Sequence, residues 1–132
     1  MKITADANVL VRAMMGDDEQ QSALAQSELA AAELVAIALP SLCELVWVLS
    51  QGYKIASDEI ADALRRLTHA ANVVVNRPAV EAGLALLDAG GDFADGVIAY
   101  EERWLGGETF VSFDKKAVKR LMAQRKAARL LE

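Results

Sequence analysis

Hydrophobic and polar positions change their spacing repeatedly along the chain, which predicts strands that alternate with helices. Short apolar runs, typical of buried parallel strands, lie at 2–6, 35–39, 72–76, 108–113 and 129–131. Segments rich in helix formers or apolar at helical spacing lie at 17–34, 41–52, 57–70, 78–91, 92–107 and 114–128. This alternation predicts an α/β fold, a three-layer α/β/α sandwich with a mostly parallel central sheet.

Individual residues sharpen some of the predicted boundaries. Pro40 should close the second strand, and Ser41 should cap the helix that follows. The pair Gly90–Gly91 is typical of a helix end. After the first strand, Ala7 and Asn8 suggest a tight turn, with only a brief helical turn before residue 17.

Length and composition indicate one compact domain covering 1–132, because 132 residues suit a single hydrophobic core. The chain is 54% hydrophobic and 25% charged, which excludes a disordered arm. No apolar run reaches the roughly 20 residues of a membrane helix, and no secretory signal is visible. We therefore expect a cytoplasmic protein without a membrane partner. The single cysteine, Cys43, excludes an internal disulfide and a thiolate metal cluster.

The formal net charge of −5 is unevenly distributed. Residues 1–111 carry seven Lys/Arg against seventeen Asp/Glu, whereas residues 112–132 carry seven against two. The basic end is either the solvated face of a helix or a surface that binds phosphates. The candidates for phosphate contact are Lys115, Lys116, Lys119 and Arg120, joined by Arg12.

Four acidic residues follow strands or open helices: Asp6, Glu44, Asp95 and Asp114. Ligands of parallel α/β sheets bind outside the carboxyl ends of the strands, and the topology could bring these acids to one such edge. Crowded carboxylates repel one another, so such a cluster requires a divalent cation or raised pKa values. An all-oxygen ligand set favours Mg²⁺ or Mn²⁺ over zinc.

Each of these acids also has a purely structural interpretation as a helix cap. Ser41 and Glu44 have the spacing of a capping box, and Asp92 and Asp95 are spaced in the same way. Asp114 could cap the last helix. The residues alone leave both interpretations open.

Four stretches, "TADANVLVRAM", "PSLCELVWVL", "DFADGVIAYEE" and "TFVSFDKKA", occur in an order that resembles the PIN-domain ribonucleases, and in this compact form the VapC toxins. The resemblance implies a metal-dependent endoribonuclease whose acidic site is formed by Asp6, Glu44, Asp95 and Asp114. Asp92 lies on the same helical face as Asp95 and could assist.

Other positions are interpreted from the same resemblance. Asn8 and Ser112 are expected to orient the carboxylates from the second layer of the site. Ser112 stands where relatives commonly have threonine. Gly96 stands where alanine is usual, which we expect to weaken the helix start by about 1 kcal/mol.

The resemblance also implies partners: an RNA substrate, a second copy in a homodimer and a VapB-like antitoxin. The apolar segment 45–49, which contains Trp47, is a candidate surface for the antitoxin, although so apolar a helix is more often core. A different class of function stays open, a catalytically silent PIN-fold binding module within a repressor or regulatory complex.

Overall fold

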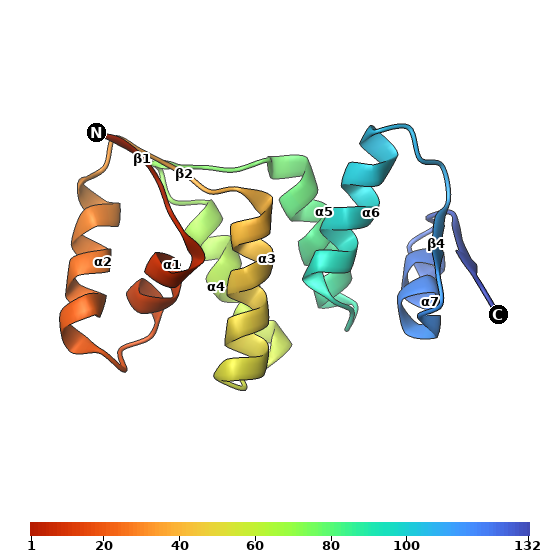
Figure 1. Ribbon diagram of the computed structural model, residues 1–132, viewed down its shortest axis with the longest axis horizontal. Coiled ribbons are helices and arrows are strands. Elements are labelled where there is room, and N and C mark those ends of the chain that lie inside the picture. Colours follow the sequence, from red (N-terminus) through yellow and green to blue (C-terminus); the bar gives the residue numbers. More distant parts are fainter. The chain divides into compact units, whose positions relative to one another are not determined.

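The computed structural model describes all of residues 1–132, and the chain divides into two compact units, Met1–Asn76 and Arg77–Glu132 (Figure 1). The N-terminal unit contains β1 (Lys2–Thr4), α1 (Ala7–Met14), α2 (Glu19–Ala31), β2 (Leu34–Ala36), α3 (Leu39–Trp47), the π-helical turn η1 (Val48–Gly52), α4 (Ser57–Thr68) and β3 (Val73–Val74). The C-terminal unit contains α5 (Arg77–Asp88), α6 (Phe93–Trp104), β4 (Phe110–Ser112), α7 (Lys115–Ala123) and β5 (Ala128–Leu130).

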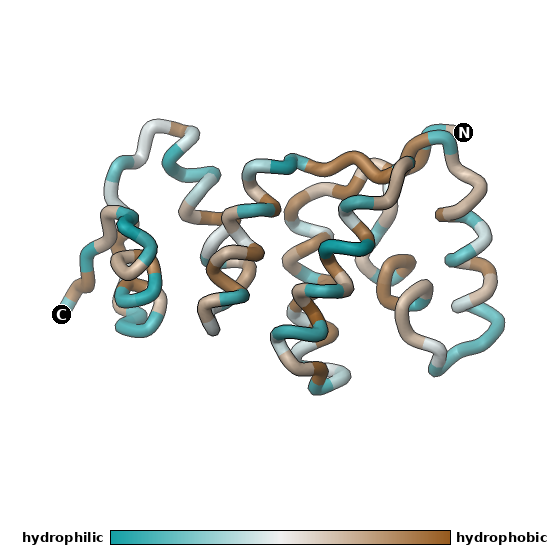
Figure 2. The backbone as a smooth tube through the Cα atoms, turned by 180° about the vertical axis from the view of Figure 1, so that it is seen from behind, coloured by the Kyte–Doolittle hydropathy of each residue, from teal (hydrophilic) through white to brown (hydrophobic).

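Parallel strands form the sheet of the N-terminal unit, in the order β1-β2-β3. Ile3 lies opposite Val35, which in turn lies opposite Val73, so the strands end at a common edge. Val35 is completely buried, as expected for the middle strand of a parallel sheet. Figure 2 shows mainly hydrophobic residues along these strands and a mixture of hydrophobic and hydrophilic residues along the helices.

The first strand leads directly into α1, so the predicted tight turn at Ala7 and Asn8 is wrong. Asp6 has extended backbone angles and caps the helix with its side chain. Ala7, Leu10 and Val11 are buried. Their spacing places them on one face of a helix, and burial of this short apolar face stabilises a helix that its length alone would not.

The second strand ends earlier than predicted, and α3 begins at Leu39 with Pro40 in its first turn. Proline suits this place because the first helical N–H groups have no partner within the helix. The predicted cap at Ser41 is therefore wrong, and so is the capping box with Glu44, since both residues lie inside α3.

The C-terminal unit has a parallel pair of strands, with Phe110 of β4 opposite Ala128 of β5. The predicted final strand is thus confirmed, shifted by one residue. Both units contain parallel strands joined through helices, so the predicted α/β class is confirmed, with one sheet in each unit. None of the helices combines the length and the apolar character that crossing a bilayer would require.

Two glycines allow α5 and α6 to approach closely. A Cβ on Gly96 would lie 2.5 Å from the carbonyl oxygen of Ala82 and 2.9 Å from Cα of Gly83. A Cβ on Gly83 would lie 2.7 Å from the ring of Phe93. The packing of α6 against α5 therefore requires glycine at position 96. The sequence showed only that glycine stands where relatives commonly have alanine. The loop between these helices contains Gly90, whose φ of +89° favours glycine.

Replacing Gly96 with alanine should destabilise the protein. Alanine would improve helix propensity by about 1 kcal/mol, but its Cβ would collide with backbone atoms of α5 that cannot rotate away. Overpacking of this kind costs about 1–3 kcal/mol, so a net loss of roughly 1–2 kcal/mol is expected in chemical denaturation. Gly16→Ala is the matched control, because a Cβ there meets nothing within 4 Å. Equal stability of both variants would contradict the close packing.

Candidate functional site

An open depression of about 490 Å³ lies at the carboxyl ends of the three strands of the N-terminal unit. Asp6 lines it after β1, and Asn76 lines it after β3. Ser41, from the first turns of α3, adds a hydroxyl group. The sequence had placed Asp6 at this edge; Ser41 and Asn76 were not among the predicted site residues, because nothing local marks them. Their positions follow only from the sheet register.

Asp6 combines a capping hydrogen bond with an available oxygen. Its Oδ1 accepts a hydrogen bond from the backbone N–H of Ala7 at 2.7 Å, and Oδ2 makes no hydrogen bond. The side chain is exposed. The cap therefore fixes the carboxylate without using both of its oxygens, and the structural and ligand interpretations of Asp6 are compatible.

Glu44 lies on α3 three positions after Ser41, which places it on the same helical side. Its side chain is exposed and takes part in no cap. Asn8 is also exposed but lines a different hollow, between β1, α1 and α2. The expectation that Asn8 orients a carboxylate has no hydrogen bond to support it.

Three aspartates gather in the C-terminal unit around the start of α6 and of α7. Asp92 caps α6, where its Oδ1 accepts a hydrogen bond from the N–H of Ala94 at 3.3 Å. Asp114 caps α7, where its Oδ1 accepts from the N–H groups of Lys116 and Ala117 at 3.0 and 3.1 Å. The cap interpretation is thus correct for both, and in each the second oxygen stays open.

Asp95 is the electrostatic centre of this group. Partial burial raises the pKa of Asp95 above its ordinary value of 3.8, and the negative charges of Asp92 and Asp114 raise it further. The charge of Arg120 acts in the opposite direction. Asp92, Asp95 and Asp114 therefore lie near enough to interact by charge.

Arg120 lies over the glycine turn that precedes α6. A Cβ on Gly91 would lie 3.0 Å from Cδ of Arg120, and one on Gly90 would lie 3.8 Å from its guanidinium. The two glycines therefore make room for the arginine side chain beside the acids. The sequence assigned Arg120 to phosphate contact; the fold places it next to the acidic group as well.

Ser112 supports Asp114 through the backbone. Its hydroxyl oxygen accepts a hydrogen bond from the N–H of Asp114 at 2.9 Å. This contact holds the turn between β4 and α7, so Ser112 orients the residue that carries the carboxylate rather than the carboxylate itself. A threonine would offer the same hydroxyl group.

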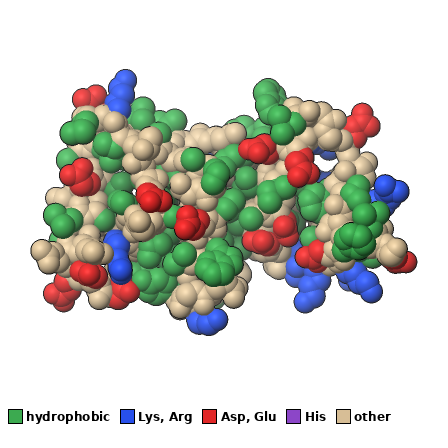
Figure 3. Space-filling view, in the orientation of Figure 1, with side chains coloured by type: hydrophobic (Ala, Val, Ile, Leu, Met, Phe, Trp, Pro, Cys, Tyr) green, Lys and Arg blue, Asp and Glu red, His purple; other side chains and the backbone are tan.

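Basic side chains follow Asp114 along α7. Lys115, Lys116 and Lys119 are exposed, and Arg120 is half-buried. Figure 3 shows the Lys and Arg side chains gathered over this helix. The charge that the sequence concentrates in this region is therefore accessible, as contact with phosphates requires.

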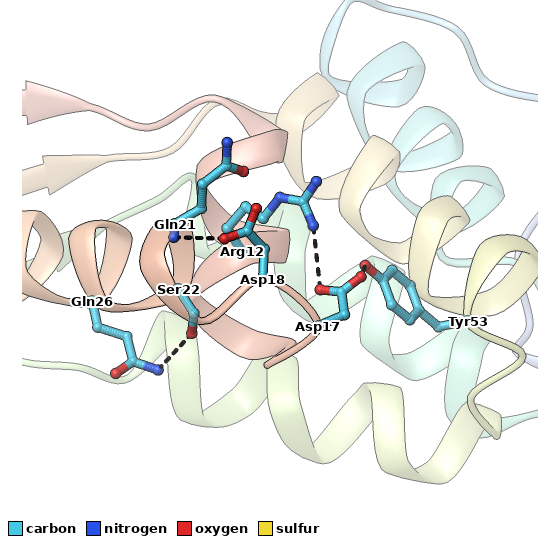
Figure 4. A network of polar contacts seen from close by, with 7 residues as sticks. All are labelled: Arg12, Asp17, Asp18, Gln21, Ser22, Gln26 and Tyr53. Carbon is cyan, nitrogen blue, oxygen red and sulfur yellow. Dashed lines mark hydrogen bonds and ion pairs between the residues drawn. The ribbon is translucent and has the colours of Figure 1, made fainter.

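Arg12 is placed differently, within a small network in the N-terminal unit (Figure 4). Its Nη1 lies 3.2 Å from Oδ1 of Asp17, and the hydroxyl of Tyr53 donates to Oδ2 of Asp17 at 2.7 Å. The Tyr53 hydroxyl, and then the charge of Arg12, lower the pKa of Asp17. Arg12 already has an anionic partner, so phosphate contact by this residue stays a prediction.

The predicted acids divide between the two units, with Asp6 and Glu44 in the first and Asp92, Asp95 and Asp114 in the second. No three Asp, Glu, His or Cys side chains are grouped closely enough to hold one metal ion. Asp92, Asp95 and Asp114 therefore influence one another electrostatically but do not form a complete coordination shell for a metal ion.

The sequence matches the PIN domain family over residues 3–121, which covers most of the chain and includes all of the acids described above. The chain belongs to the PIN-domain family. Membership generally indicates nuclease activity, and PIN nucleases typically use divalent metals. A search among curated proteins found no significant match.

The raised pKa of Asp95 predicts how stability depends on pH. Ionising Asp95 costs more in the folded than in the unfolded chain, so its contribution to stability is present below 3.8 and is lost as pH rises through the raised value. Asparagine cannot ionise, so Asp95→Asn avoids this cost. The variant should raise the melting temperature in EDTA at about pH 7 but not at about pH 3. The gain should be small, since solvent screens a partly exposed group.

Thermal unfolding of the two proteins across this pH range measures the effect. Asp62→Asn, at an exposed position on α4, is the control and should show no comparable gain at neutral pH. A neutral-pH melting temperature that falls in Asp95→Asn would contradict the repulsion among the three aspartates.

Proposed function

We propose that the chain is a metal-dependent endoribonuclease whose acidic set is Asp6, Glu44, Asp95 and Asp114, with Asp92 assisting. The observation that carries this proposal is the combination of PIN-family membership with capped aspartates whose second oxygen is open. A carboxylate held by one oxygen and open at the other is already oriented for a ligand.

The donor chemistry of these residues suits Mg²⁺ or Mn²⁺. Carboxylate oxygens are the ligands that these hard cations prefer. Burial, and after it the charges of Asp92 and Asp114, raise the pKa of Asp95, and a bound cation would offset both effects. When bound, such an ion lowers the pKa of a water and neutralises charge on the phosphate. Asp6, Glu44, Asp95 and Asp114 would hold it.

Other residues of the chain would orient the carboxylates and bind the phosphates. The helix caps of Asp6 and Asp114 keep their carboxylates in place, and Ser112 holds the backbone before α7. Lys115, Lys116, Lys119 and Arg120 attract the phosphates that the acids alone would repel. Attack of water in line with the leaving 3′ oxygen would produce a 5′-phosphate and a 3′-hydroxyl.

Replacing Asp6 with asparagine should remove metal-dependent RNA cleavage while leaving the fold intact. Asparagine keeps the oxygen that accepts from Ala7 but replaces the open oxygen with an amide. Cleavage of a labelled RNA in Mg²⁺ or Mn²⁺ should fall by more than about 100-fold. Wild-type activity should disappear in EDTA.

Asp18→Asn provides a control, because the side chain of Asp18 also caps a helix, by accepting from the N–H of Gln21 in α2, but Asp18 is not one of the proposed ligands. It should retain wild-type cleavage. Full RNA cleavage activity in Asp6→Asn would contradict the proposed role of the acids. No cleavage by the wild-type chain, with RNA still bound, would favour the alternative of a silent binding module.

We further propose that the nuclease is the toxin of a toxin–antitoxin pair, acts in the cytoplasm as a homodimer and is neutralised by a VapB-like antitoxin. The support is the resemblance of the four motifs to VapC toxins, together with Trp47 in the candidate surface 45–49. Leu45, Val46 and Leu49 are buried, whereas Trp47 is 66% exposed and available to a partner.

Induced expression of the chain in bacteria should arrest growth, and expression of Asp6→Asn should not. Co-expression of a short neighbouring reading frame that encodes the antitoxin should restore growth, and Trp47→Ala should weaken this rescue. The measurement is bacterial growth during induction. Normal growth with an active, soluble nuclease would refute the toxin role but would leave the enzyme proposal intact.

A further inference from the structure

We propose that Phe113 is a stacking platform for an unpaired base of the RNA at the start of α7. This inference rests on the proposed nuclease function and assigns a binding role to a side chain outside the acidic set. Phe113 lies between Ser112, the last residue of β4, and Asp114, the cap of α7. Its side chain is 75% exposed.

The backbone on either side of Phe113 is held by hydrogen bonds. The N–H of Asp114 donates to Ser112 Oγ at 2.9 Å, and Asp114 Oδ1 accepts from the first turn of α7. An aromatic ring presented from a fixed backbone loses little conformational freedom when a ligand stacks on it. The exposed position of Phe113 is thus a property of an ordered turn.

The charges around Phe113 favour a nucleic acid over an apolar protein segment. Asp114 follows directly and caps α7. Lys115 and Lys116 come next, and Lys119 lies one turn further along the helix, so three exposed lysines outnumber the one adjacent acid. Lysines that contact the phosphates, together with an aromatic ring that stacks on the base, form the usual combination for binding single strands. Bases in a duplex are stacked on one another and are not available to such a ring.

Trp104 is the other strongly exposed aromatic residue of the C-terminal unit, and it has no comparable group of lysines beside it. Trp104, at the end of α6, is 79% exposed. Arg103 precedes it directly, but Glu101, Glu102 and Glu108 outnumber that single cation. An acidic surrounding repels phosphates, so Trp104 offers an aromatic surface without the charges that would bring RNA to it. It is therefore a suitable control for Phe113.

The experiment measures binding and cleavage separately. Dissociation constants for a labelled single-stranded RNA and for a duplex of the same sequence are measured in EDTA, where no cleavage occurs, at several salt concentrations. Phe113→Leu removes the aromatic ring and keeps an apolar side chain, Phe113→Trp keeps an aromatic ring, and Trp104→Leu is the control. Cleavage rates in Mg²⁺ or Mn²⁺ are then measured for the same proteins.

Phe113→Leu should weaken single-strand binding roughly tenfold with an unchanged salt dependence, because the lysine contacts remain. Phe113→Trp should bind at least as well as the wild type, and Trp104→Leu should bind like it. Duplex binding should be the same in all four proteins. The melting temperature of Phe113→Leu should match that of the wild type.

An unchanged single-strand affinity in Phe113→Leu, or an equal loss for duplex, overturns the inference; in either case wild-type cleavage would leave the nuclease proposal standing. A lower melting temperature in Phe113→Leu also overturns it, since the ring would then be packing against protein. If the wild-type chain neither binds nor cleaves RNA, the proposed function fails, and this inference fails with it.

Discussion

The hydrogen bond between an aspartate and the helix that it opens is the constraint on which the proposed site depends. Asp6, Asp92 and Asp114 each accept backbone N–H groups through Oδ1 and leave Oδ2 open. The cap orients the carboxylate because the helix N-terminus is itself held by packing. In this chain the cap uses one oxygen of each carboxylate and leaves the other for the proposed ligand role, so the two interpretations are compatible.

Packing and electrostatics meet at Asp95. The next residue, Gly96, approaches the backbone of α5 so closely that no Cβ fits. This approach seats α6 against α5. Asp95 itself is partly buried, and its pKa rises through that burial and through the charges of Asp92 and Asp114.

Opposite charges are arranged along one helix in the C-terminal unit. Asp114 opens α7, and the exposed lysines and Arg120 follow it. Arg120 returns across the glycine turn towards the acids and offsets part of their repulsion. Anionic and cationic groups therefore lie close together on one short helix. In the proposed nuclease the acids would bind a metal ion and the cations would bind the phosphate.

The sequence by itself determined the order of strands and helices, the parallel class of the fold, the basic end of the chain and the acids worth examining, because local periodicity and residue type carry that information. It could not place the start of α3, where Pro40 is compatible with either a strand end or a first helical turn, nor the full length of α1, which burial of Leu10 and Val11 stabilises. The reason for Gly96, the room made for Arg120 and the pKa of Asp95 arise from contacts between residues distant in sequence. Only the tertiary structure decided them, since no local pattern records which backbone will lie opposite a given residue.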